Sequence, residues 1–147
     1  MSLNAIVSPM EKNLLLGLVL ALALCGTLPA QDITQNILRC RGDRVKNLVN
    51  GDDISFDVDI RITRQQKIEW IQKGGQLNHT YSILAVNGSW VDVSQPGSIT
   101  YTVMYQDKRG EVRVVRDATG VFIICDTRNG TEGSYYKLII GSVGLDQ

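Results

Sequence analysis

The stretch "ISFDVDIRIT", residues 54–63, alternates apolar and polar residues without interruption. Because successive side chains of a β-strand point to opposite faces, this period of two puts every apolar side chain on one face. The polar residues between them, including Asp57 and Asp59, fall on the other face. The stretch therefore predicts a strand with one face in a hydrophobic core and the other in solvent.

Similar short apolar segments follow one another along the rest of the chain, separated by residues typical of turns. They predict strands at 80–86 and 89–93 around a tight Asn87-Gly88 turn, 98–106 and 111–117 around 107–110, and 120–127 and 134–140 around 128–133. Residues 67–72 suit a further strand or a short helical turn, and residues 32–40 also suit a short N-terminal helix.

These segments amount to about seven short strands with no long helical pattern between them. Such a pattern predicts an all-β fold, either an antiparallel sandwich or a small barrel. The alternation favours neither arrangement over the other.

The first thirty residues have a different character. Lys12 precedes the apolar run of residues 13–28, and Ala30 supplies a small residue before polar sequence begins. This layout predicts a secretory signal peptide over residues 1–30, followed by a single β-rich domain over residues 31–147. The alternative is a retained N-terminal anchor, although the uninterrupted apolar core of 12 residues is shorter than the roughly 20 that a membrane span requires. We therefore expect a secreted, periplasmic or cell-surface protein, with a membrane involved only if this segment is retained.

Loss of the leader would leave two cysteines, Cys40 and Cys125. A pair of cysteines in an exported chain predicts one disulfide, which would contribute roughly 4–5 kcal/mol by closing a long loop. Export also makes Asn78, Asn87 and Asn129 candidates for N-glycosylation, because each begins an Asn-x-Ser/Thr sequon.

The segment "RCRGDR", residues 39–44, contains the tripeptide Arg-Gly-Asp. Gly42 and Asp43 predict a surface turn. The tripeptide is either a chance product of turn chemistry or an attachment signal, and the sequence leaves both open.

Charge and composition exclude some functions. Fifteen basic residues balance fifteen acidic ones, so no basic excess is available to neutralise phosphates, and we expect no nucleic-acid partner. His79 is the single histidine, which gives little support to a nucleophilic triad. No motif calls for a cofactor. Three acids near one strand, Asp53, Asp57 and Asp59, are candidates for a weak metal site or for a carboxylate-dependent hydrolase.

Three aromatic residues are candidates for ligand contacts: Trp70, Tyr135 and, beside the expected hairpin, Trp90. Together these features favour a disulfide-stabilised domain that binds a protein or carbohydrate, or that forms part of a surface assembly. The alternatives are a small extracytoplasmic hydrolase that uses carboxylates and a membrane-anchored structural protein of the envelope. The sequence favours a binding protein over an enzyme.

Overall fold

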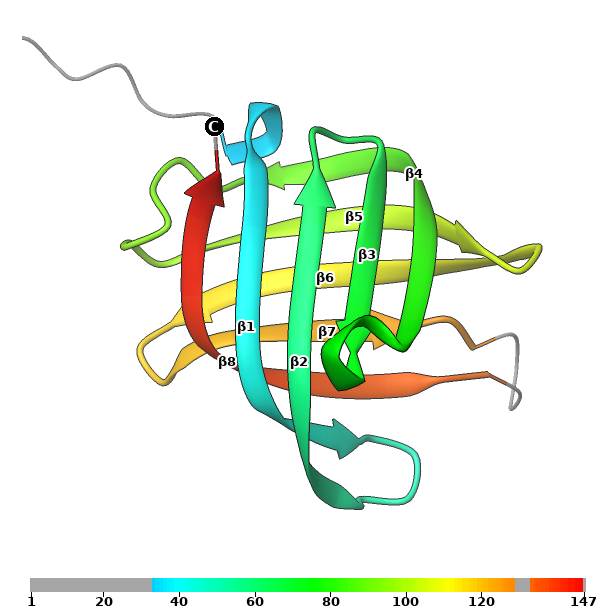
Figure 1. Cartoon of the computed structure of the whole chain (residues 1–147). Coiled ribbons are helices and arrows are strands. Elements are labelled where there is room, and N and C mark those ends of the chain that lie inside the picture. The colour runs from blue at the N-terminus through cyan, green and yellow to red at the C-terminus, as the bar shows by residue number, and fades with distance from the viewer. Residues whose placement is uncertain (1–32, 129–132, 147) are drawn as a thin grey trace, which may run out of the picture. The chain divides into compact units, whose positions relative to one another are not determined.

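A computed structural model describes residues 33–128 and 133–146 of the protein. The described residues form one antiparallel sheet of eight strands in which each strand pairs with the next and β8 pairs with β1 (Figure 1). The elements in order are η1 (Ile33–Gln35), β1 (Ile37–Asn47), β2 (Asp53–Thr63), β3 (Lys67–Gln72), η2 (Lys73–Gly75), β4 (Leu77–Ser89), β5 (Gly97–Tyr105), β6 (Lys108–Asp117), β7 (Gly120–Asp126) and β8 (Tyr135–Asp146). The all-β prediction is confirmed, and the closed sheet makes the domain a barrel rather than a sandwich.

The barrel has two crossed halves. In Figure 1 the ribbons of β1 to β3 run nearly upright, whereas those of β5 to β7 run across behind them, and β4 and β8 bend from one direction into the other. The pairing register shifts where these bends occur, between Ile83 and Ala85 in β4 and around Gly42 in β1, opposite β8. Bulges of this kind increase strand twist and let a sheet turn a corner.

Gly42 lies where the backbone of β8 leaves no room for a side chain on β1. A Cβ at this position would overlap the carbonyl oxygen of Ile139 and would lie 3.0 Å from its carbonyl carbon. The predicted turn at Gly42 and Asp43 is therefore wrong. The Arg-Gly-Asp tripeptide lies inside a strand that pairs on both sides, where a glycine is required by the neighbouring backbone.

The tight turn predicted at Asn87-Gly88 is also wrong. Both residues lie inside β4, and they pair with Thr100 and Ile99 of β5. Gly88 has a φ of 94°, a value open to glycine without strain, so the chain passes through this position as a strand irregularity. Residues 89–93 consequently do not form a strand of their own.

The predicted strand at 67–72 and those flanking the 128–133 connection are confirmed as β3, β7 and β8. Near the N-terminal end, the helical alternative for residues 32–40 reduces to the three residues of η1, and β1 begins at Ile37.

The inward side chains fill one end of the barrel. Ile33 of η1 and Trp90, which follows β4, are 1% and 3% exposed and belong to the same core cluster as the barrel interior. They close the end where β1 begins and β4 ends. The barrel interior next to this closed end is mainly aliphatic. Its residues that are each at most 2% exposed include Leu38, Val58, Ile60, Ile62, Ile68, Ile99, Val103, Val112, Val114, Ile123 and Leu138.

The predicted disulfide is wrong, because Cys40 and Cys125 are both buried free thiols. Strand β8 lies between them and pairs Cys40 with Val143 but Cys125 with Tyr136. Those partners are seven residues apart along β8, or roughly 23 Å at the rise of a strand. A disulfide requires Cα atoms within about 7 Å.

Residues 1–32 lie outside the described residues, so the signal peptide and its alternative anchor stay predictions. Within residues 33–128 and 133–146, no helix is long and apolar enough to cross a membrane.

Candidate functional site

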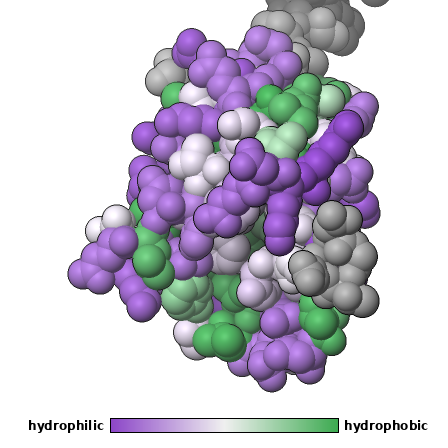
Figure 2. All heavy atoms as spheres, turned by 90° about the vertical axis from the view of Figure 1, so that its right-hand side faces the viewer, coloured by the Kyte–Doolittle hydropathy of each residue, from purple (hydrophilic) through white to green (hydrophobic). Residues whose placement is uncertain are grey.

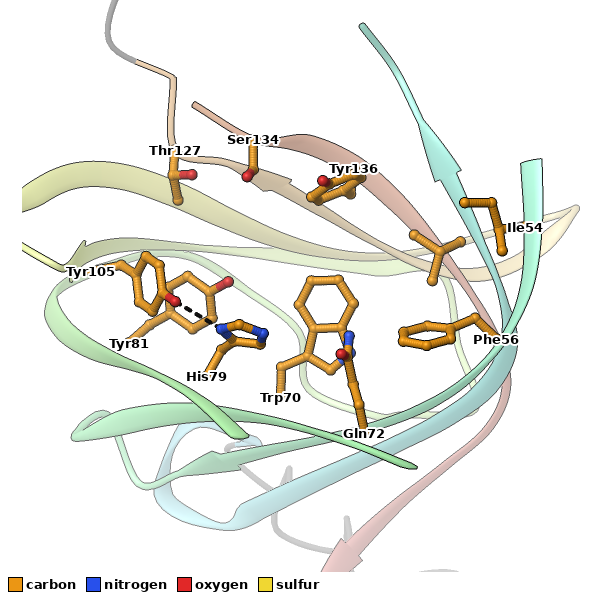
Figure 3. Close-up of a pocket in the computed structure, with 11 residues that line it drawn as sticks. Ile54, Phe56, Trp70, Gln72, His79, Tyr81, Tyr105, Thr127, Ser134 and Tyr136 are labelled. Atoms are coloured by element: carbon orange, nitrogen blue, oxygen red, sulfur yellow. Dashed lines mark hydrogen bonds between the residues drawn. The ribbon is translucent and has the colours of Figure 1, made fainter. Parts of the chain in front are cut away.

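A cavity of about 360 Å³ occupies the other end of the barrel (Figure 3). This end is where β1, β3, β5 and β7 finish and where β2, β4, β6 and β8 begin. The cavity is therefore the mouth of the barrel, opposite the end closed by Ile33 and Trp90. Its lining residues are Val45, Ile54, Phe56, Trp70, Gln72, His79, Tyr81, Tyr105, Thr127, Ser134 and Tyr136.

Strand β3 illustrates how the sequence builds the mouth. Its inward residues are Ile68, Trp70 and Gln72, in order from the filled part of the barrel to the rim. The period of two thus carries an aliphatic side chain, then an aromatic one, then a polar one along the same face. β7 also ends in a polar residue, because its inward residues Ile123 and Cys125 are followed by Thr127 just beyond the strand end.

Aromatic rings form the walls of the cavity. The Trp70 ring lies 6.0 Å from that of His79 and 6.1 Å from that of Tyr136 between ring centroids. Tyr105 continues the cluster, with its ring 5.8 Å from His79 and 4.7 Å from Tyr81. These spacings fall within the range of favourable aromatic pairs. The rings come from β3, β4, β5 and β8, so the cluster fixes several strands of the mouth relative to one another.

His79 is held by a hydrogen bond. The hydroxyl oxygen of Tyr105 lies 2.7 Å from Nδ1 of His79, and the hydroxyl donates when Nδ1 carries no proton. Burial raises the pKa of the Tyr81 hydroxyl well above its usual range, and neighbouring ionisable groups add to the shift. Tyr81 is therefore neutral at physiological pH.

The cavity lining carries almost no charge. Among the described residues that line it there is no Asp, Glu, Lys or Arg, and His79 is the one side chain of a basic type. An ion placed here without an opposite charge would lose its hydration without compensation. The chemistry of the lining therefore suits an uncharged molecule.

Two polar groups of β3 make no hydrogen bond with the part of the chain that the structure describes. Gln72 is 6% exposed and lines the cavity, and its carboxamide makes no hydrogen bond with any described residue. The indole Nε1 of Trp70 is covered and also has no hydrogen-bond partner in the described part of the chain. For the covered Nε1 of Trp70, leaving a buried donor unpaired costs about 1–3 kcal/mol. A site with such groups gains most from a molecule that supplies the missing partner.

Exposed apolar side chains lie near the same end. Ile54 at the start of β2 is 56% exposed, Leu77 at the start of β4 is 41% exposed, and Val49 in the β1–β2 connection is 63% exposed. Figure 2 views the side on which the β5–β6 turn projects in Figure 1, and it shows separate hydrophobic patches among hydrophilic side chains. The rim is thus mixed rather than a continuous apolar surface.

The structure separates the three aromatic residues predicted to contact a ligand. Trp70 lines the cavity. Trp90 is wrong as an exposed contact, because it is buried at the opposite end, where its Nε1 donates to the carbonyl oxygen of Gln95 at 2.9 Å. Tyr135 is half-buried and does not line the cavity, and the Arg128 guanidinium stacks 3.8 Å from the centre of its ring.

The predicted carboxylates do not form a site together. Arg39 donates to both carboxylate oxygens of Asp59, at 3.1 and 2.7 Å, and this contact holds the pKa of Asp59 below its usual value. Asp57 is exposed, and Asp53 pairs with Arg44 at 3.5 Å. Over the described ranges, no group of three His, Cys, Asp or Glu side chains is arranged to hold a metal ion.

Two of the candidate glycosylation residues, Asn78 and Asn87, are exposed in β4. Asn129 lies outside the described residues.

The sequence reasoning missed Gln72, Thr127 and His79 as members of the site. Each continues the inward alternation of its strand, yet each is polar. A polar residue in phase with core residues at the end of a strand is the signal that could have identified the mouth.

Comparison with known proteins gives no match: no family model, no curated protein and no solved structure is similar to this chain at a significant level.

Proposed function

We propose that the protein binds one small, uncharged and mainly apolar molecule in the mouth of its barrel. An eight-stranded barrel is just wide enough either to be filled by side chains or to hold one small ligand. In this barrel, aliphatic side chains fill the interior from the closed end as far as the aromatic cluster. The cavity beyond them has a volume of about 360 Å³, which lies within the range of pockets that bind small molecules. The observation that carries the proposal is the Gln72 side chain, which lines this aromatic cavity and whose carboxamide makes no hydrogen bond with any described residue.

The proposal narrows the binding role expected from the sequence. A protein partner would use a broad surface, whereas the aromatic and polar groups here converge on a concave space in the mouth of the barrel. Aromatic walls also suit the apolar face of a sugar, but the surface that lines the cavity is mainly apolar, which favours a less hydroxylated molecule. The signal-peptide pattern of residues 1–30 supports a role outside the cytoplasm.

The two tryptophans allow a direct test, because Trp70 lies in the cavity and Trp90 lies at the closed end. The variant Trp90→Phe leaves Trp70 as the sole tryptophan. Titration with the neutral dye N-phenyl-1-naphthylamine should quench Trp70 emission and raise dye emission, with saturation at one dye per chain. The matched variant Trp70→Phe keeps Trp90 as the reporter, and its emission should change much less.

A blocking variant supplies the control for location. Ser134 is half-buried at the lip of the cavity, so Ser134→Trp in the Trp90→Phe background should fill space in the mouth and weaken dye binding at least about tenfold. Circular dichroism verifies that this variant remains folded. Dye binding that is undetectable in the parent, or that is equal in the folded blocking variant, would refute a ligand site in the mouth.

A further inference from the structure

We propose that the ligand carries a hydrogen-bond donor next to an acceptor on one edge of a planar ring, as a cyclic amide does, and that this edge pairs with the Gln72 carboxamide. This inference rests on the proposed function. It goes further by naming the chemical class of the ligand and its orientation in the mouth.

The backbone holds Gln72 at a fixed place in the mouth. It is the last residue of β3 and pairs with Leu77 of β4. The chain then reverses through η2, where Lys73, Gly74 and Gly75 have φ values of 47°, 63° and 96°. This tight reversal leaves Gln72 on the inward face, directly above Trp70.

The neighbours of Gln72 offer it no exchange of hydrogen bonds. In Figure 3 its side chain points from β3 toward the cavity, with Trp70 on one side and Phe56 on the other. Nδ1 of His79, another polar group of the lining, is engaged with the hydroxyl of Tyr105. The carboxamide is therefore left with both its donor and its acceptor for a molecule inside the cavity.

A carboxamide selects a particular partner. It presents an N–H donor and a carbonyl acceptor side by side, so its best complement presents an acceptor and a donor side by side. A carboxylate would offer acceptors alone, and an ammonium group would offer donors alone. Either ion would also be buried in a lining with no Asp, Glu, Lys or Arg among its described residues. A neutral cyclic amide satisfies both groups of Gln72 and brings no charge.

The aromatic walls select a flat molecule. Rings of Trp70, His79, Tyr105 and Tyr136 surround the space beside Gln72 at centroid spacings of 5.8–6.1 Å between neighbours. A planar ring can stack on one of these faces or meet its edge while its own polar edge points to the carboxamide.

Three probes of similar size and shape test the inference by displacing N-phenyl-1-naphthylamine from the full chain. 2-Quinolinone has the adjacent N–H and C=O, N-methyl-2-quinolinone keeps only the acceptor, and naphthalene has neither. We expect 2-quinolinone to bind at least about tenfold more tightly than its N-methyl derivative, because the latter leaves the Gln72 carbonyl unpaired.

The variant Gln72→Met keeps the length of the side chain and removes both hydrogen-bonding groups. It should reduce the preference for 2-quinolinone to within about twofold and leave naphthalene binding intact. Gln76→Met, at an exposed glutamine just before β4, is the matched control and should retain the full preference. The comparison of the two quinolinones on the unaltered protein does not depend on the folding of any variant.

The outcomes distinguish the inference from the proposed function. If the dye binds but the two quinolinones do not differ, or fail to displace it, or keep their preference in folded Gln72→Met, the cyclic-amide class is refuted while the ligand site stands. If the dye itself does not bind, the proposed function fails together with the inference.

Discussion

Replacement of Gly42 by alanine should severely destabilise the barrel, because it acts where β8 closes on β1. The added Cβ would overlap the carbonyl oxygen of Ile139, and it would lie 3.0 Å from the carbonyl carbon of Ile139 and 3.2 Å from Cα of Ile140. All three atoms belong to the backbone of a paired strand. Relief therefore requires the two strands to separate, whereas a crowded side chain could simply rotate.

The size of the effect follows from what separation would break. Overpacking in a core costs about 1–3 kcal/mol even where side chains can adjust. Moving β1 away from β8 would also weaken the ladder on either side of Gly42, at roughly 1 kcal/mol for each hydrogen bond lost. We expect a total of about 3–5 kcal/mol, which is a large part of the 5–15 kcal/mol that stabilises a typical domain. At about 4 °C per kcal/mol for a domain of this size, the melting temperature should fall by roughly 12–20 °C.

Gly144 supplies the matched control because it lies in β8, has no positive φ, and an added Cβ would meet no atom within 4 Å. Gly144→Ala should stay within about 0.5 kcal/mol of the parent protein. Urea denaturation followed by circular dichroism measures both variants. Equal midpoints for Gly42→Ala and Gly144→Ala would show that β1 and β8 do not approach this closely, and the closure of the sheet would have to be assigned differently.

Three other predictions concern an ion pair, the two cysteines and one turn of the barrel. Arg39 holds the pKa of Asp59 below its unfolded value. Their pair therefore stabilises the protein above an unfolded pKa of about 3.9, and this stabilisation is lost as the pH falls through the folded pKa. Asp59→Asn should lower the urea midpoint at neutral pH and should lose less further stability than the parent between about pH 4 and pH 2; an unchanged neutral midpoint would contradict this. Burial raises the pKa of the Cys40 and Cys125 thiols to about 12. Peptide mapping should therefore find these thiols alkylated by iodoacetamide only after denaturation. Their modification in the native protein would show that the interior is accessible. Gln106 has a φ of 47° in the two-residue turn between β5 and β6. Because a positive φ strains residues other than glycine, Gln106→Gly should raise stability by up to about 1 kcal/mol in thermal unfolding. A clear loss of stability would show that the turn is not strained.

The strands were predictable because alternation reports which face of a strand is buried. Residues 54–63 and 134–140 contain the pattern that β2 and β8 follow in the structure. The same alternation cannot distinguish a sandwich from a barrel, because the difference is whether the first and last strands pair. That pairing depends on the close approach at Gly42, and its sequence context resembles an ordinary turn.

Turns were harder to locate than strands. Asn87-Gly88 has the composition of a tight hairpin, but pairing with β5 continues through it to Ser89. Two-residue turns occur instead at Gln106-Asp107 and at residues 118–119. The φ values of 47° and 61° at Gln106 and Asp107 are unusual for these residue types. At Asn87-Gly88 and at Gln106-Asp107 the tertiary pairing of the strands overrides the local preference of the residues.

The site was only partly predictable, for a related reason. Trp70 was a candidate from its aromatic character alone, but Tyr105 and Tyr136 run in phase with buried aliphatic residues and look like core. Whether such a ring fills the barrel or borders a cavity depends on how far the rings of other strands reach toward it. That distance is set by the closure of the sheet, and alternation within a single strand carries no information about it.

The cavity has an energetic consequence that connects the fold with the proposed function. The open mouth of about 360 Å³ lacks the dispersion contacts that packed side chains of that volume would make. Larger aliphatic side chains there would supply these contacts, as they do in the filled part of the same barrel. The chain instead places polar groups such as Gln72 and Thr127 there, on the inward face where closer packing would favour apolar residues. The same polar groups that weaken the packing of the mouth can bind a molecule from solution, so the loss of stability in the free barrel and the capacity to bind a ligand have one structural cause.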